Sequence, residues 1–364
     1  MENFQLNELL IALPEISLLT LACLVLIVDL FIKDSARGFT FSLCKTVLVL
    51  LALIIIYGQS DEIRYSFSDM YVADPLSDVL KFGACVFVLI MLIYSQNYLL
   101  PRPIYRGEFF TLTLFSLLGM MIMMSANHFL ILYLGLELLS LSLYAMVALS
   151  RGLLSSAEAA VKYFILGALA SGILLYGMSM IYGATGSLYI SEVAGSLTSG
   201  SAQMNLALFG LVFLVAGVAF KLGAVPFHMW VPDVYQGAPT AVTMLIGTAP
   251  KLAAYAFVFR LLVEGMGDGR MSVEWRQMFL ILAVLSIGFG NLVAIAQRNI
   301  KRMLAYSTIA HMGFVLLGFA TGLTNGLASA MFYVFTYVLA ALGAFGIILF
   351  LSRRGFESDD INDF

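Results

Sequence analysis

Residues 204–228 read MNLALFGLVFLVAGVAFKLGAVPFH and carry a single formal charge, on Lys221. About twenty apolar residues in a helix rising 1.5 Å per residue cross the ~30 Å hydrocarbon core of a bilayer. Gly223 and Pro226 follow the lysine at once. Proline cannot donate to the helix ladder, and its ring clashes with the carbonyl one turn back. The stretch therefore predicts a membrane span that breaks beside a charged residue.

Apolar runs of this length fill the rest of the chain. Its 364 residues are 61% hydrophobic and only 11% charged, with a mean hydropathy of +0.97. A soluble domain carries about 25% charged residues, so this chain cannot cover a water-facing surface. We expect an all-α polytopic membrane protein with no separate soluble domain. Its eleven spans are expected near residues 9–32, 39–58, 74–99, 107–125, 128–149, 155–183, 204–224, 238–264, 274–296, 302–321 and 325–352.

The basic residues of alternate connections divide unequally. One side holds eleven: Lys33, Arg37, Lys45, Arg102, Arg106, Arg151, Arg298, Lys301, Arg302, Arg353 and Arg354. The other side holds three: Arg64, Arg270 and Arg276. Cytoplasmic loops are enriched in Lys and Arg, so we expect a periplasmic N-terminus and a cytoplasmic C-terminal end. Residues 1–8 lack a basic segment and a cleavage site, which favours a true first span and a bacterial inner membrane.

Five ionisable residues lie deeper in the expected spans: Lys81, Glu137, Lys162, Lys221 and Lys251. A charge at a span centre costs about 2.5–3.5 kcal/mol on insertion scales. Such a residue is therefore expected either to be paired inside the bundle or to take part in the protein's function. Glu137 occupies the middle of span five. It is either a helix-packing carboxylate or a proton-pathway group and counter-ion of a buried lysine, and we favour the second.

Lys251 lies mid-span, directly after Pro250, too deep to reach either interface. The proline should kink the helix and free a carbonyl one turn earlier. Burial favours the neutral amine and a nearby carboxylate favours the ammonium, so a lysine with a movable counter-ion can act as a proton switch. For Lys221 two interpretations stay open. The backbone break beside it either lines a wet cavity, or the span simply ends there and the lysine reaches the interface.

The remaining candidates are weaker. Lys162, about two turns into span six, is intermediate between an interfacial and a functional lysine, and for Lys81 we favour an interfacial role. Arg260, near the outer end of span eight, is expected to extend to the interface.

Three histidines complete the set. His128 is expected to face lipid headgroups. His311 is mid-span and could relay protons, or could be an ordinary core residue, and His228 follows the break as a second possible relay.

Competing chemistry finds no support in the sequence. It contains no Walker loop and no Gly-x-Gly-x-x-Gly between a strand and a helix. Three histidines on separate helices, without cysteine partners, do not suggest haem or zinc. The net charge of −3 gives no indication of nucleic acid. The residues point instead to ion movement through buried Lys and Glu.

Several segments together resemble subunit N of the proton-translocating NADH-quinone oxidoreductase, respiratory complex I, one of the antiporter-like membrane subunits. They are 134–141 (LGLELLSL), 159–164 (AAVKYF), 220–240 (FKLGAVPFHMWVPDVYQGAPT), 250–251 (PK) and 299–313 (NIKRMLAYSTIAHMG). The resemblance runs the whole length of the chain.

The resemblance implies inverted five-helix repeats, each with a broken helix, and a role in coupling NADH oxidation by quinone to proton movement. Glu137 would pair with Lys221, Lys251 would be the central membrane lysine, and Lys162 would belong to the half-channel through which protons enter. The subunit would bind no cofactor; NADH, FMN, iron-sulfur clusters and quinone would belong to partner subunits. Its partners would be the other membrane subunits and the lipid bilayer.

The chain departs from the family in length. The family has fourteen helices, and eleven are expected here, so we expect a truncated second repeat without its own broken helix and lysine. The expected parts are residues 1–106 with three helices, 107–264 as the first repeat, and 265–364 as the start of the second. Two rivals remain: a subunit of a multisubunit cation/proton antiporter, and a purely structural membrane subunit whose buried charges hold helices in register.

Overall fold

The computed structural model describes residues 6–33, 36–150, 152–353 and 356–363. The basic residues Arg151 and Arg354, and the first five residues of the N-terminal segment, lie outside this part of the chain.

Within the described residues, eleven helical spans are long and apolar enough to cross a membrane. Each overlaps one of the eleven expected spans, so the all-α polytopic fold class is confirmed. The spans are α2 (Leu13–Leu30), α3 (Gly38–Gly58), α4 (Pro75–Leu99), α5 (Gly107–Met124), α6 (Phe129–Val147), α7 (Leu154–Thr185), α9 (Met204–Leu222), Thr240–Glu264, α13 (Gly269–Ile295), α14 (Ile300–Ala320) and α15 (Thr324–Leu351).

Span eight is not one regular helix. It consists of α11 (Thr240–Gly247), α12 (Pro250–Val258) and a π-helical segment, η2 (Phe259–Glu264). The shorter elements are α1 (Leu6–Ile11), β1 (Arg64–Ser66), β2 (Tyr71–Ala73), α8 (Ile190–Ser199), α10 (Trp230–Gly237) and the 3-10 turn η3 (Ile361–Asp363). Strands β1 and β2 form an antiparallel hairpin in which Tyr65 pairs with Val72.

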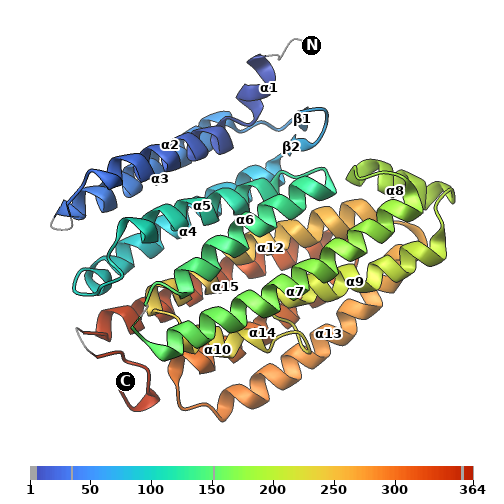
Figure 1. Ribbon diagram of the computed structural model, residues 1–364. Coiled ribbons are helices and arrows are strands. Elements are labelled where there is room, and N and C mark those ends of the chain that lie inside the picture. Colours follow the sequence, from blue (N-terminus) through green and yellow to red (C-terminus); the bar gives the residue numbers. More distant parts are fainter. Residues whose placement is uncertain (1–5, 34–35, 151, 354–355, 364) are drawn as a thin grey trace.

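The helices run side by side in one bundle (Figure 1). The pair α2 and α3 lies at one edge and α13 at the opposite edge, with the other spans between them. The most extensive contacts join neighbours in sequence or nearly so: α13 with α14, α7 with α9, and α5 with α6.

The connections gather at the two ends of the bundle. At one end the β1–β2 hairpin meets the α5–α6 connection, where Asn127 donates its backbone N–H to Met70 at 3.0 Å. The segment before α8 joins them, since Ile190 donates to the carbonyl of Asn127 at 3.1 Å. At the other end the C-terminal segment lies beside the start of α14, where Ile361 donates to Arg298 at 3.0 Å. We call these the hairpin end and the tail end.

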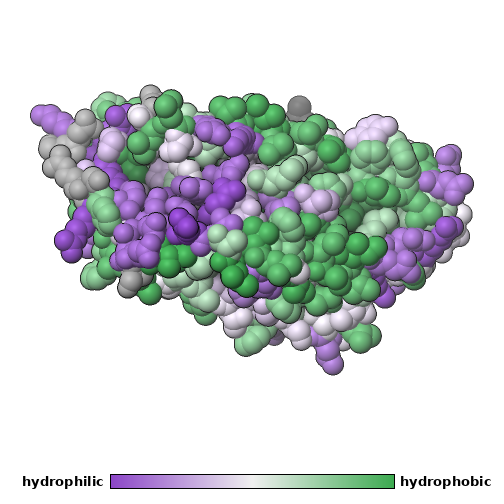
Figure 2. Space-filling view, turned by 90° about the horizontal axis from the view of Figure 1, so that it is seen from below, coloured by the Kyte–Doolittle hydropathy of each residue, from purple (hydrophilic) through white to green (hydrophobic). Residues whose placement is uncertain are grey.

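The surface agrees with a bilayer-spanning bundle. Figure 2 shows apolar residues covering the middle of one face and polar residues gathered toward its two ends. Large apolar side chains such as Phe332, Phe350 and Ile295 are 70%, 87% and 85% exposed. In a bilayer these side chains would contact lipid tails instead of water.

Glycines let neighbouring spans approach at backbone distance, as small residues do in membrane bundles. A Cβ built on Gly119 of α5 would lie 2.5 Å from the backbone nitrogen of Leu139 and 2.7 Å from the carbonyl oxygen of Gly135, both on α6. Gly177 and Gly210 bring α7 and α9 together in the same way. These contacts fix α6 and α9, the helices that carry Glu137 and Lys221.

Candidate functional site

The break predicted after Lys221 is present. Helix α9 ends at Leu222, and Gly223 takes a left-handed conformation with φ +79°. Only glycine adopts this region readily. The chain resumes a helix at Trp230, and the Trp230 indole N–H donates to the Phe220 carbonyl at 2.9 Å. The Val225 N–H donates to Ser286 of α13 at 2.9 Å. Span seven is therefore α9 followed by α10, with non-helical backbone held by protein groups between them.

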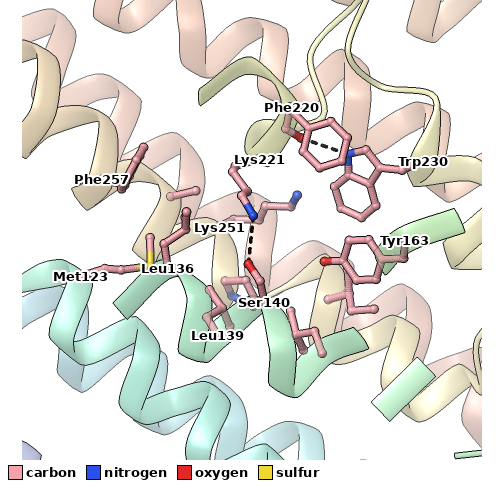
Figure 3. A pocket seen from close by; sticks show the side chains of 14 residues that line it. Met123, Leu136, Leu139, Ser140, Tyr163, Phe220, Lys221, Trp230, Lys251 and Phe257 are labelled. Atoms are coloured by element: carbon pink, nitrogen blue, oxygen red, sulfur yellow. Dashed lines mark hydrogen bonds between the residues drawn. The ribbon is translucent and has the colours of Figure 1, made fainter. Parts of the chain in front are cut away.

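Lys221 is held inside the bundle and does not reach an interface. Its ammonium donates to the hydroxyl of Ser140 on α6 at 3.0 Å (Figure 3). It also donates to the hydroxyl of Ser171 on α7 at 3.2 Å. Both serines lie near the middle of their helices. The structure therefore argues against the interpretation in which the span ends and Lys221 reaches the interface.

Glu137 and Lys221 make no direct ion pair among the described contacts. Oxygen Oε1 of Glu137 is buried without a hydrogen-bond partner. Glu137 precedes Ser140 by three residues on α6, and residues three apart share a helix face. Ser140 therefore stands where a direct pair was expected.

Lys251 is 3% exposed and comes from the first turn of α12. Lys251 lies eleven residues after Thr240, the tail-end start of span eight. At 1.5 Å per residue this is about 16 Å into the ~30 Å core, so Lys251 lies close to mid-membrane. Its Nζ lies 6.0 Å from the ring centre of Trp230, within range of a cation–π attraction.

Lys221 and Lys251 line one cavity of about 50 Å³ (Figure 3). Most of its wall is apolar, and the polar groups on it come from the two lysines, Ser140, Tyr163 and Trp230. A water molecule needs at least about 10–15 Å³ of such space, so the cavity has room for about three. Two lysines from different broken spans thus border one small space with room for water.

The break in span eight lies just before Lys251. Thr248 has φ −120° and ψ −101°, outside the helical region, and Pro250 starts the next helix. The Lys251 N–H donates to Thr248 at 2.9 Å, so the Gly247 carbonyl loses its usual helix partner. The Tyr337 hydroxyl of α15 donates to that carbonyl at 3.1 Å. The kink predicted from Pro250 is confirmed.

Lys162 belongs to a separate charged network toward the tail end. Its ammonium lies 2.8 Å from a carboxylate oxygen of Glu158 and 2.9 Å from Asp233 of α10. Asp233 also accepts from Arg302 of α14 at 2.7 Å. From the sequence, Asp233 has no assigned role and Arg302 is placed only among the basic residues of the connections. Their pairing depends on how α7, α10 and α14 pack, so no local signal indicated it.

The two candidate histidines are separated from the cavity. His228 lies in the break of span seven, where Nδ1 is buried without a partner and the ring stacks edge-on against Phe289 at 4.9 Å. His311 of α14 shares a hydrogen bond with the Tyr333 hydroxyl at 2.8 Å, and its ring lies 5.1 Å from that of Tyr337. Neither lines the cavity between the lysines.

Two expectations at the hairpin end were wrong. Arg260 is 1% exposed and does not extend to the interface, because it bonds Asp74 and Glu264, each at 2.7 Å, and the carbonyl of Met124. His128 does not face headgroups. It is 8% exposed and accepts the backbone N–H of Leu130.

Lys81 also differs from its expected interfacial role. It is 1% exposed, with Nζ 2.6 Å from Glu15 and 2.9 Å from the Tyr71 hydroxyl. The Tyr71 hydroxyl in turn donates to Glu15 at 2.7 Å. These three groups form a closed polar cluster between α2, β2 and α4.

Known protein families match nearly the whole chain. Residues 126–364 match the family "NADH:quinone oxidoreductase/Mrp antiporter, TM", and residues 16–124 match "NADH-ubiquinone oxidoreductase chain 4, amino terminus". NADH-quinone oxidoreductase subunit N of Nitrosomonas europaea is 56% identical over 361 residues, which cover 99% of this chain and 75% of that protein. Subunit N of Thioalkalivibrio sulfidiphilus is 54% identical over 100% of this chain and 75% of its own.

Solved structures share the fold. A chain of respiratory complex I from Thermus thermophilus superposes with a TM-score of 0.79 and 31% identity, over 95% of this chain and 72% of that one. A chain of an archaeal membrane-bound sulfane sulfur reductase gives 0.83 at 24% identity over 98% and 73%, and one of the Mrp complex from Dietzia gives 0.78 at 19% over 94% and 64%. The last two show likeness of fold alone. By its relatives and by its matched family regions, the chain belongs to the NADH-quinone oxidoreductase subunit N family.

Proposed function

We infer that this proton-translocating membrane subunit of NADH-quinone oxidoreductase moves protons through the cavity between Lys221 and Lys251. The observation that carries the proposal is that these two lysines, from two broken spans, border one small space with room for water. Intramembrane ionisable residues that face a bundle interior mark proton relays in pumps. Of the rivals, the antiporter subunit is disfavoured by the 56% identity to subunit N.

The charges around the cavity favour one proton at a time. Two ammonium groups bordering one low-dielectric space repel each other, so one lysine is favoured as the neutral amine. A carboxylate on the same face of α6 as Ser140 favours the proton on Lys221, and the Ser140 and Ser171 hydroxyls accept from that ammonium. The site therefore holds its proton on Lys221 while Glu137 is close.

A change that moves Glu137 away would release the proton. Lys221 then becomes a neutral amine, and the proton passes through water in the cavity to the neutral amine of Lys251, which becomes the ammonium. The number of protons is unchanged by this transfer. Quinone reduction elsewhere in the complex would drive the movement of Glu137.

Protons would enter from the tail end through the Lys162 network. Asp233 and Trp230 are one turn apart on α10, and Tyr163 follows Lys162 directly on α7. The Tyr163 and Trp230 rings stack with centres 4.7 Å apart, and both line the cavity. The charged network and the cavity are thus neighbours along two helices.

The proposal also covers the orientation of the protein in the membrane, the location of the cofactors and the division of the chain. The tail end would be cytoplasmic, because most basic connections lie there, and the hairpin end periplasmic in a bacterial inner membrane. NADH, flavin, iron-sulfur clusters and quinone would be bound by partner subunits. Residues 1–106, 107–264 and 265–364 would be the leading helices, the first repeat and the start of the second.

Two substitutions of Lys251 test whether it carries protons or only holds helices. Lys251→Met removes the charge, and Lys251→Arg keeps a charge that does not leave at physiological pH. The proposal expects a reduced proton-to-electron ratio in NADH-driven inverted vesicles for both variants, with the complex assembled. The structural rival predicts a normal ratio for Lys251→Arg, and that result would overturn the proposal.

A further inference from the structure

Helix α11, the tail-end half of span eight, is a short segment isolated by breaks on both sides. All eight of its residues, Thr240–Gly247, are buried. It follows the turn at Pro239 and ends at the non-helical Thr248. Ile246 of α11 and Lys251 beyond the break both line the lysine cavity. A movement of α11 would therefore reach Lys251 directly.

The first end of α11 is held by a carboxylate from the segment after α15. Glu357 accepts from the Thr240 hydroxyl at 3.0 Å, and its other oxygen accepts from the Tyr98 hydroxyl at 2.9 Å and from Arg102 at 3.0 Å. Tyr98 accepts the Thr240 backbone N–H at 3.1 Å. The first N–H groups of a helix have no partner within the helix, and here protein groups supply one.

The last residue of α11 is held by α15 itself. The Tyr337 hydroxyl donates to the Gly247 carbonyl, which the break has left without a helix partner, at 3.1 Å. Tyr337 is 7% exposed, so water does not readily replace this contact. Both ends of α11 therefore depend on α15 and the segment that follows it.

The contact at Gly247 has two mutually exclusive arrangements. Tyr337 also lies 2.8 Å from the Thr308 hydroxyl, which can donate to the Leu304 carbonyl at 2.8 Å. Each hydroxyl carries one proton, so Tyr337 donates either to Gly247 or to Thr308. The buried Tyr235 hydroxyl of α10 lies 3.2 Å from the position of a Cβ on Gly247. The Tyr235 hydroxyl is thus a third hydroxyl group close to Gly247, beside those of Tyr337 and Thr308.

We propose that Tyr337 and Glu357 are positioning residues for Lys251, and that they act through α11. The region after residue 265 sets the position of Lys251 by holding or releasing the two ends of this helix. The inference rests on the proposed function, since it assigns Tyr337 and Glu357 a role in the proton step at Lys251.

The test is Tyr337→Phe in the full chain within the assembled complex. This change removes one hydroxyl and keeps the ring. The proton-to-electron ratio in NADH-driven inverted vesicles is expected to fall, with a roughly two- to tenfold lower proton flux, the effect of one lost buried hydrogen bond. Glu357→Gln, which keeps the shape but removes the charge, is expected to lower the ratio in the same direction.

Thr308 supplies a matched pair that does not depend on Tyr337 variants assembling. Thr308→Val is isosteric and has no hydroxyl, so Tyr337 keeps only its contact with Gly247, α11 cannot be released, and proton flux is expected to fall. Thr308→Ser keeps the hydroxyl and is expected to retain the proton flux of the native protein. Equal flux in the two variants would overturn the proposal, because a packing role does not require the hydroxyl.

A double variant separates positioning from general packing. If Tyr337 acts through Lys251, Tyr337→Phe causes no further loss of proton flux in a Lys251→Met background. An additive loss contradicts the proposal. If Lys251→Met lowers flux while Tyr337→Phe and Glu357→Gln leave it normal, this inference is wrong and the proposed function stands. If Lys251→Met leaves flux normal, the proposed function itself fails.

Discussion

Lys221 and Lys251 border the same buried cavity although they come from two different spans, each broken beside its lysine. The breaks have separate chemical causes. In span seven Gly223 adopts a left-handed conformation, and in span eight Pro250 removes a helix N–H. Non-helical backbone survives at membrane depth only where it is buried in protein or lines a water-filled cavity, and here protein groups hold both breaks.

The serines that hold Lys221 should matter for proton transfer more than for folding. In Ser140→Ala with Ser171→Ala the ammonium loses both of its hydroxyl acceptors, each of which contributes about 0.5–1.5 kcal/mol. We expect slower NADH-driven proton flux in assembled complexes. Ser142→Ala is the control, since that hydroxyl bonds the Leu138 carbonyl of its own helix. Equal flux in the control and the double variant would contradict the role of the two serines.

The Lys162 network should set the rate at which protons enter. Asp233→Asn leaves Lys162 with Glu158 alone and removes the carboxylate that Arg302 contacts. We expect lower proton flux at saturating NADH with normal assembly. Lys33→Gln is the control, because Lys33 is an exposed lysine in the connection after α2. A normal flux in Asp233→Asn would show that protons enter elsewhere.

The ion pair between Arg260 and Asp74 should stabilise the hairpin end in a pH-dependent way. Burial alone would raise the pKa of Asp74, but hydrogen bonds and charge from Arg260, with bonds from Ser77, lower it below its ordinary value. A lowered carboxyl pKa gives stability that is present above the unfolded pKa of about 4 and is lost as pH falls through the folded value.

Breaking that pair should therefore cost stability at neutral pH. Arg260→Met is expected to lower the free energy of unfolding by about 3–5 kcal/mol, because it leaves a buried carboxylate unpaired. The difference in thermal stability between the native protein and Asp74→Asn should be constant above about pH 5 and shrink below about pH 4. A difference that grows on acidification would contradict the pairing.

Helix approach at Gly119 should be required for placing Glu137. Gly119→Ala puts a Cβ within 2.5 Å of backbone on α6, and overpacking of this kind costs about 1–3 kcal/mol. We expect reduced amounts of assembled complex in membranes. Gly172→Ala is the matched control, since nothing lies within 4 Å of a Cβ there. Both variants assembling equally well would show that α5 and α6 can separate without harm.

The spans and their breaks could be predicted from the sequence because they depend on local properties. Apolar run length sets a span, and Gly223 or Pro250 breaks a helix wherever it folds. The burial of Lys251 followed from its distance to both interfaces. These features needed no knowledge of which helices become neighbours.

The partners of the buried charges could not be predicted, because they depend on the packing of distant helices. The ammonium of Lys221 contacts Ser140 and Ser171, and no sequence pattern marks these two among many serines. Arg260 was expected at the interface, since its pairing with Asp74 links residues far apart in the chain. The shared cavity arises only when α9, α6 and α12 come together.

NADH-driven acidification of inverted vesicles carrying Lys221→Ala tests whether protons pass through Lys221, with electron transfer and assembly followed on the same membranes. If protons pass through Lys221, assembly stays intact while proton pumping and the turnover coupled to it fall sharply. Normal pumping with normal coupled turnover would contradict a proton path through Lys221 and favour a purely structural role for the buried charges.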